Sequence, residues 1–199
     1  HYADTLGILL MCDFPNFGEG GDTPLGRTRF EQTMRAAIER DFNHPSIVAW
    51  CLFNETWGFG GQSEFVKLIN PHPPDTGEGE MIESAGKKLS NENAYLWVQS
   101  IYRLAKSLDP TRLIEDMSVV AWEHLEYYGH GETDVNSWHF YTNDYDKARS
   151  SIEEIVEQTF AGSTYNYVPG FQQGNQPLIN SEFGGVGALD GDVDTSWSF

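Results

Sequence analysis

The sequence has little positive charge, few cysteines and no long apolar run. Twelve lysines and arginines stand against 30 aspartates and glutamates, which gives a net charge of -18. Such a balance repels phosphate groups, so we expect no nucleic acid and no membrane surface as a partner. No apolar stretch approaches the roughly 20 residues of a membrane-spanning helix. Cys12 and Cys51 both lie in apolar runs, which predicts buried free thiols rather than a disulfide framework.

Three further absences narrow the class of protein. No glycine-rich phosphate-binding turn follows any apolar run, which argues against a nucleotide site. The six histidines show neither paired spacing on a helix nor a cysteine partner, so we expect no catalytic metal and no cofactor. The N-terminus begins at His1 and shows neither an initiator methionine nor the regions of a signal peptide, which suggests a chain cut from a longer protein.

The apolar residues that are present fall into alternating strand-like and helix-like segments. With 199 residues and 39% hydrophobic content, the chain can bury a sizeable core as one globular unit. The predicted strands are 8–14, 47–53, 112–117, 134–141 and 177–183. The predicted helical faces are Phe30, Met34, Ala37, Ile38 and Phe42, then Ala94, Trp97, Val98, Ile101, Leu104, Ala105 and Leu108, then Ile152, Ile155, Val156 and Phe160.

This alternation predicts an α/β fold with a parallel sheet and helical crossovers. An open doubly wound sheet is the alternative, but it lacks its usual glycine-rich turn here. Polar and aromatic residues instead follow several strands, at Asp13, 54–57, Asp116, 139–141 and Glu182. That placement is typical of a (β/α)8 TIM barrel, whose eight strands need about 250 residues. We therefore predict an incomplete barrel over residues 1–199.

Two segments end an apolar run with a glutamate. They are 53–57, which contains Glu55, and 180–185, which contains Glu182. Two carboxyl groups delivered to one rim can break a glycosidic bond, one as acid/base and the other as nucleophile. A single glutamate after a strand is usually a solvated surface residue, but the pair in this context indicates a retaining glycoside hydrolase.

The motif 43–46, Asn-His-Pro-Ser, followed by an apolar strand and Asn54-Glu55, resembles a signature of glycoside hydrolase family 2. That family contains the β-galactosidases, β-glucuronidases and β-mannosidases. Residues 177–185 resemble its nucleophile strand, and 2–8 resemble the helix that enters its third barrel strand. The resemblance implies that strands three to seven are present here. It places strands one, two and eight, with preceding β-sandwich domains, in the rest of a parent chain.

The resemblance implies Glu55 as acid/base on strand four and Glu182 as nucleophile on strand seven. It also implies that Asn54 holds the sugar 2-hydroxyl. From the residues themselves, Tyr141 is a candidate donor to Glu182 and His139 a candidate ligand of sugar hydroxyls, with a purely structural hydrogen bond the equal alternative for each. Two weaker candidates are Trp57 for sugar stacking, against packing, and Asp13 for sugar hydroxyls, against loop capping.

Residues 58–90 lack clear periodicity and follow the strand that leads to Glu55. A loop of this length is usually a binding loop or lid, so we predict an active-site insertion, with a disordered surface insertion as the alternative. The leading function is an exo-acting β-galactosidase or β-glucuronidase that takes a carbohydrate substrate. An endo-acting mannanase or cellulase and an inactive carbohydrate-binding piece are the alternatives. We expect the 199 residues alone to be inactive, and the resemblance leaves a homo-oligomer open.

Overall fold

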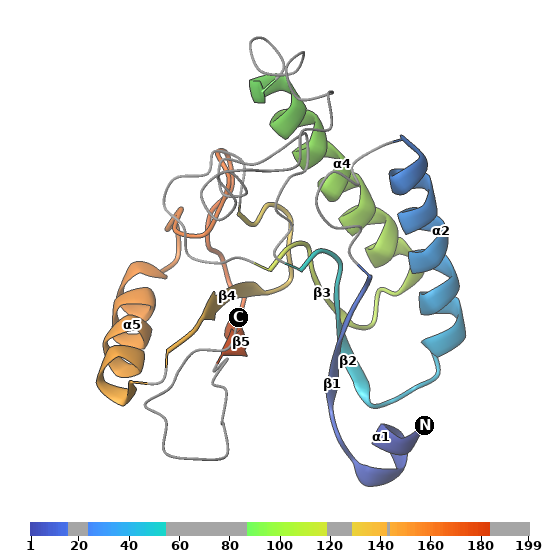
Figure 1. Ribbon diagram of the computed structural model, residues 1–199, viewed down its shortest axis with the longest axis horizontal. Coiled ribbons are helices and arrows are strands. Elements are labelled where there is room, and N and C mark those ends of the chain that lie inside the picture. The colour runs from blue at the N-terminus through green and yellow to red at the C-terminus, as the bar shows by residue number, and fades with distance from the viewer. Residues whose placement is uncertain (16–23, 55–86, 119–128, 143, 184–199) are drawn as a thin grey trace, which may run out of the picture. The chain divides into compact units, whose positions relative to one another are not determined.

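The computed structural model describes residues 1–15, 24–54, 87–118, 129–142 and 144–183, with 87–94 described by their backbone (Figure 1). The chain divides into two compact units. The first comprises 1–117 with 132–134, and the second comprises 118–131 with 135–199. Each is described here by itself.

The first unit is built on a parallel three-stranded sheet in the order β1-β2-β3. Its elements are α1 (Tyr2–Leu6), β1 (Leu10–Asp13), α2 (Pro24–Asp41), β2 (Ile47–Cys51), α4 (Lys87–Leu108) and β3 (Leu113–Glu115). All three predicted strands are confirmed, although each is shorter than its apolar run. One further backbone hydrogen bond continues the pairing past the end of each strand pair. Phe14 N donates to Cys51 O and Leu52 N donates to Glu115 O, with a length of 3.0 Å in both cases.

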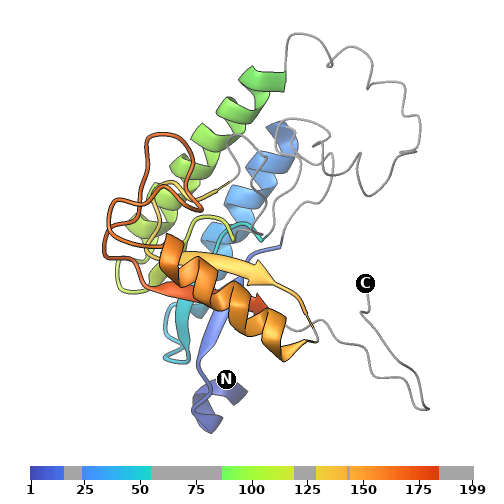
Figure 2. The ribbon, with the colours of Figure 1, turned by 90° about the vertical axis from the view of Figure 1, so that its left-hand side faces the viewer.

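Helices α2 and α4 run alongside one another within this unit (Figures 1 and 2). The predicted periodicity is confirmed at the centre of each face, because α2 buries Phe30, Met34 and Ile38, and α4 buries Val98, Ile101 and Ala105. Aromatic rings join the helices to the sheet. Phe30 stacks on Phe53 with ring centroids 4.5 Å apart and meets Trp97 edge-on. Phe42, which follows α2, is exposed instead of buried, since the helix ends at Asp41.

A buried carboxylate connects the end of α4 to β2. Asp109 has no exposed surface, and its side chain accepts hydrogen bonds from Trp50 Nε1 (2.9 Å), Thr111 Oγ1 (2.6 Å) and Arg112 Nη1 (2.6 Å). Burial alone would raise the pKa of Asp109, but the hydrogen bonds from Thr111, Trp50 and Arg112 outweigh it and hold the pKa well below the usual range. The carboxylate is therefore ionised inside the fold.

Arg112 extends this connection to the turn before β2. Its guanidinium donates to the carbonyls of Phe42 (2.7 Å), His44 (2.9 Å) and Ile47 (2.7 Å). Asp4 holds the same turn from the other side, with Oδ1 accepting from Ser46 N and Oδ2 lying 2.6 Å from His44 Nδ1. Hydrogen bonds from Ser46 and His44 lower the pKa of Asp4. The Asn-His-Pro-Ser motif thus serves to anchor the start of the strand that leads to Asn54.

The second unit contains a parallel pair of strands joined by a helical crossover. Its elements are β4 (Asn136–Phe140), α5 (Tyr145–Gln158) and β5 (Leu178–Phe183). Asp144 caps α5. The predicted third helical face is buried at Ile155 but wrong at Ile152, Val156 and Phe160, which are 45%, 56% and 63% exposed. Ile155 is the one residue of α5 that is buried in the described structure.

A buried amide network supports the segment that returns to β5. Asn136 Nδ2 donates to Gln173 Oε1 (2.8 Å), and Asn166 Nδ2 donates to Asn136 Oδ1 (3.3 Å). Tyr167 OH also donates to Gln173 Oε1. This network ties the loop before β5 to the first residue of β4, which fixes how the two strands meet.

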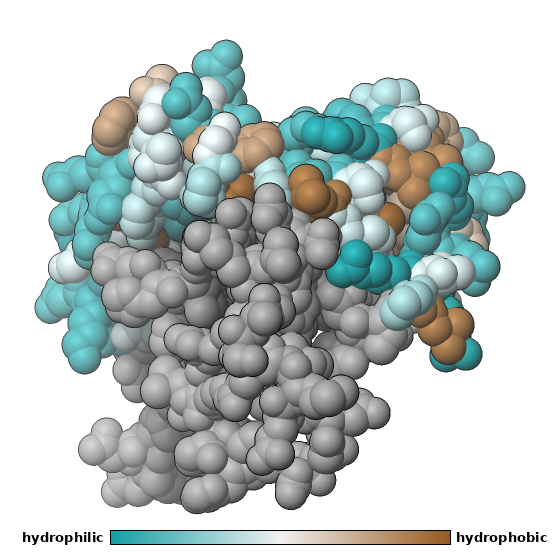
Figure 3. Space-filling model, turned by 90° about the horizontal axis from the view of Figure 1, so that it is seen from above, coloured by the Kyte–Doolittle hydropathy of each residue, from teal (hydrophilic) through white to brown (hydrophobic). Residues whose placement is uncertain are grey.

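On the face that Figure 3 shows, the described residues are mostly hydrophilic, with small apolar patches. None of the described helices combines the length and apolar character that a bilayer crossing requires.

Candidate active site

The strand pair β4 and β5 places His139 beside Glu182. The register pairs Trp138 with Asn180 and then His139 with Glu182, so Ser181 is an extra residue on β5. Such a bulge places two residues of one strand opposite one residue of its partner and re-aims their side chains. Both Ser181 and Glu182 consequently reach the imidazole of His139.

The His139 ring contacts each of these side chains through a different nitrogen. Nε2 lies 3.0 Å from Ser181 Oγ, and Nδ1 lies 3.5 Å from Glu182 Oε2. The His139 side chain is 2% exposed, whereas that of Glu182 is 43% exposed. The carboxylate therefore faces solvent while its neighbour is enclosed, an arrangement in which a substrate can reach the carboxylate and the imidazole can hold it.

Tyr141 follows the same strand. Its ring lies edge-on to His139, with centroids 6.3 Å apart. The predicted hydrogen bond from Tyr141 to Glu182 stays a prediction.

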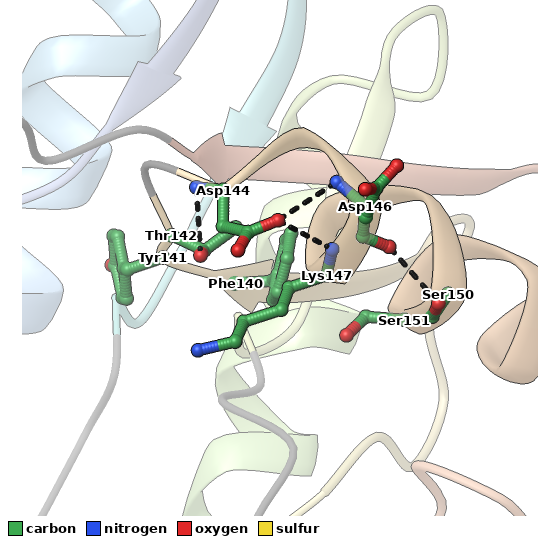
Figure 4. A pocket seen from close by; sticks show the side chains of 8 residues that line it. All are labelled: Phe140, Tyr141, Thr142, Asp144, Asp146, Lys147, Ser150 and Ser151. Carbon is green, nitrogen blue, oxygen red and sulfur yellow. Dashed lines mark hydrogen bonds between the residues drawn. The ribbon is translucent and has the colours of Figure 1, made fainter.

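A shallow pocket of about 520 Å³ opens where β4 leads into α5, with Tyr141 on its wall (Figure 4). Asp144 Oδ1 accepts from Asp146 N (2.9 Å) and Lys147 N (3.0 Å), so a carboxylate already caps the start of the helix. Hydrogen bonds from the Lys147 and Asp146 backbone lower the pKa of Asp144. Because this carboxylate occupies the helix end, the pocket is poorly suited to an anion bound at that point.

In the first unit, a row of polar side chains crosses the ends of the strands. The register pairs Asp13 with Cys51 and Cys51 with Glu115, which puts the three residues on one face of the sheet. Burial, together with the Glu115 and Asp13 carboxylates, raises the pKa of the Cys51 thiol well above its ordinary value. Cys51 is therefore a neutral thiol, and its predicted buried free state is confirmed.

Polar side chains thus lie at the strand ends of both units, as the resemblance to a barrel enzyme family predicts. Residues 3–194 match the family model described as glycosyl hydrolases family 2, TIM barrel domain. The chain belongs to glycosyl hydrolase family 2. The predicted TIM barrel class is thereby confirmed, while the assignment of β1 to β5 as barrel strands three to seven stays a prediction.

Individual proteins resemble this family 2 chain in sequence or in fold. A stretch of 89 residues is 35% identical to a β-galactosidase of Aeromonas hydrophila subsp. hydrophila, covering 39% of this chain and 8% of that protein. The fold is similar to Bacteroides uniformis β-glucuronidase 2, with TM-score 0.56, 19% identity, and coverage of 91% of this chain and 18% of the other. It is also similar to an Eisenbergiella tayi β-galacturonidase, with TM-score 0.59, 21% identity, and coverage of 96% and 27%. The chain thus spans under a third of each of these proteins.

Several predicted site residues of this family 2 chain lie at the strand ends. Asp13 ends β1 and is exposed, and Asn54 follows β2 and is partly exposed. Glu55 and Trp57 lie outside the described residues, so the convergence of Glu55 with Glu182 stays a prediction. Of the predicted insertion, 58–86 lie outside them as well, whereas 87–90 are helical because α4 begins at Lys87.

Two residues of interest were not assigned a role from the sequence. No sequence pattern indicates a role for Ser181, because a bulge depends on how two strands pair and not on the local sequence. Glu115 is fully buried at the end of β3, and an acidic residue inside an apolar run was the available signal. Across the described ranges, no three His, Cys, Asp or Glu side chains are grouped as metal ligands.

Proposed function

We propose that the complete protein containing this chain hydrolyses β-glycosidic bonds with retention of configuration, with Glu182 as nucleophile and Glu55 as acid/base. The observation that supports this most directly is the half-exposed Glu182 carboxylate at the end of β5, 3.5 Å from the buried His139 ring. Its position at the carboxyl end of a parallel strand is where barrel enzymes carry catalytic groups. Family 2 membership supports the same assignment.

The proposed reaction takes two steps. Glu182 attacks the anomeric carbon while Glu55 protonates the departing glycosidic oxygen, which leaves a sugar ester on Glu182. Water then attacks that carbon as Glu55 takes its proton, and the Glu182 carboxylate departs. A retaining pair requires carboxyl groups about 5–5.5 Å apart, so we expect that separation between Glu55 and Glu182 in the complete barrel.

The surrounding residues have distinct proposed roles. Asn54 and Asp13, which end neighbouring strands, are expected to hold sugar hydroxyls, and Trp57 is expected to offer a face for stacking. Tyr141 is expected to donate to Glu182. The burial of His139 and its two contacts on β5 favour orientation of Glu182 over direct binding of sugar hydroxyls.

The proposed substrate class is a β-linked terminal sugar, either a galactoside or a hexuronide, released by an exo-acting enzyme. The named relatives are a β-galactosidase, a β-glucuronidase and a β-galacturonidase. The β-glucuronidase is covalently bound to cyclophellitol-6-carboxylate aziridine. The remainder of the parent chain is the proposed partner that completes the barrel.

We expect the complete protein to hydrolyse at least one aryl β-galactoside, β-glucuronide or β-galacturonide and to release the β-anomer first, because two inversions restore the starting configuration. Proton NMR of the anomeric signal during the first minutes of hydrolysis, before mutarotation, measures this. Initial release of the α-anomer would contradict the retaining mechanism. Internal cleavage of an end-blocked polysaccharide would instead indicate the endo-acting class.

A further inference from the structure

We propose that Ser181 is a positioning residue that holds the ring of His139 in the orientation in which the Nδ1 proton of His139 faces the Glu182 carboxylate. This inference rests on the proposed function only in treating Glu182 as the nucleophile. Ser181 acts through His139 and does not itself contact the sugar in this proposal. Its position in the bulge of β5 is the reason that it can act in this way.

The bulge makes the three-residue contact possible. In a regular strand, adjacent side chains point to opposite faces, so Ser181 and Glu182 could not both meet one ring on β4. The shift of register between Trp138 and His139 places the two residues opposite the same partner. Ser181 Oγ reaches Nε2 at 3.0 Å, while Glu182 Oε2 lies 3.5 Å from Nδ1.

The chemistry of the two contacts decides which nitrogen carries the proton. An ionised carboxylate only accepts hydrogen bonds, so the nitrogen facing Glu182 is favourable only when it carries a hydrogen. A serine hydroxyl can donate, so Ser181 can satisfy the lone pair that neutral His139 then presents at Nε2. The carboxylate therefore favours the Nδ1-protonated form, and the serine hydroxyl, which can donate or accept, is compatible with it.

The tautomer matters because the opposite form would repel the nucleophile. With the proton on Nε2, the Nδ1 lone pair would point at Glu182 Oε2, and the carboxylate would turn away from its reactive position. The 3.5 Å separation is longer than an ordinary hydrogen bond, and such contacts often shorten when substrate binds. Ser181 would thus hold the donor in readiness for the transition state.

The test compares Ser181→Ala with Ser181→Thr in the complete protein. We expect Ser181→Ala to lower kcat by about 10–100-fold, as loss of a partner that orients a functional histidine does elsewhere, with KM little changed. Ser181→Thr keeps the hydroxyl and should restore most of the activity. The control is Ser163→Ala, a serine of the same unit whose hydroxyl bonds to backbone, at Gln158 O and Tyr165 N, and which should keep kcat.

The second readout is independent of turnover. Histidine-labelled protein should show His139, assigned by its loss in His139→Gln, as a neutral ring protonated at Nδ1 in long-range nitrogen–proton NMR spectra. Ser181→Ala should leave the proton on Nδ1, which the Glu182 carboxylate favours, and should shift the Nε2 resonance, because Nε2 loses the serine hydroxyl. An Nε2-protonated or doubly protonated ring in the unaltered protein would overturn the proposal, as would an alanine variant with unchanged kcat and spectrum. Equal losses in the alanine and threonine variants would also overturn it. Failure of Glu182 as nucleophile would leave the NMR result intact, so the two failures are distinguishable.

Discussion

Glu182→Gly should lower kcat of the complete protein by at least about 10³-fold, because removing the proposed nucleophile leaves only binding and the remaining groups. The substitution also clears space beside His139, into which a small anion can enter. Sodium azide should therefore restore release of an aryl leaving group. The product should be a glycosyl azide of inverted configuration, since azide attacks once from the face that Glu182 occupied. Product NMR and the initial rate of aryl release measure both effects.

The matched control pairs two further variants, Glu182→Gln at the proposed nucleophile and Glu153→Gln elsewhere in the same unit. Glu153 is an exposed glutamate on α5, so its neutralisation removes one negative charge from the same unit without touching the strand end. The control should keep its activity. Wild-type turnover in Glu182→Gly would remove Glu182 from the mechanism, and a rescued product of retained configuration would assign it the acid/base role instead.

The fold was largely predictable because its strands are short apolar runs with clear ends. Helix α4 ends at Leu108, next to Asp109-Pro110, because the residue before a proline is disfavoured in a helix. The third helical face was less successful, because periodicity shows which residues share a face but not how much surface is available to cover it. Phe160 lies beyond the end of α5 and is 63% exposed for that reason.

The sequence was enough to predict which residues belong to the candidate site, but not which contacts they make. Glu182 and His139 follow from the position of polar residues after strands, but Ser181 depends on an extra residue in the register, which no local pattern reveals. For His139, contact with sugar hydroxyls and a structural hydrogen bond were equal alternatives, because its burial could not be read from the sequence. The same limit applies to Asp109, whose hydrogen-bond partner Trp50 is far away in sequence and meets it only in the folded chain.

Asp109→Asn should destabilise the first unit by about 3 kcal/mol at neutral pH, because removing one charge of a buried pair leaves the other uncompensated. Arg112 is 11% exposed at its side chain and would lose the ionised partner that lies 2.6 Å away. Trp50 and Thr111 would also face an amide in place of a carboxylate. Because these contacts hold the start of β2, the variant should lower the free energy of unfolding of the unit that carries Asn54. Urea-induced unfolding of the complete protein measures the change.

The difference in free energy of unfolding between the wild type and Asp109→Asn should depend on pH, and this dependence tests whether the Asp109 charge is responsible. The folded-state pKa of Asp109 lies below its unfolded value of about 4, so the carboxylate contributes its full stabilisation above that pH and loses it as the pH falls toward the folded pKa. The gap between the wild type and Asp109→Asn should therefore be constant from about pH 6 to 8 and narrow below about pH 4. Glu39→Gln, an exposed change on α2, should stay within about 0.5 kcal/mol of the wild type throughout. A gap that persists undiminished in acid would mean that the Asp109 charge is not what joins α4 to β2.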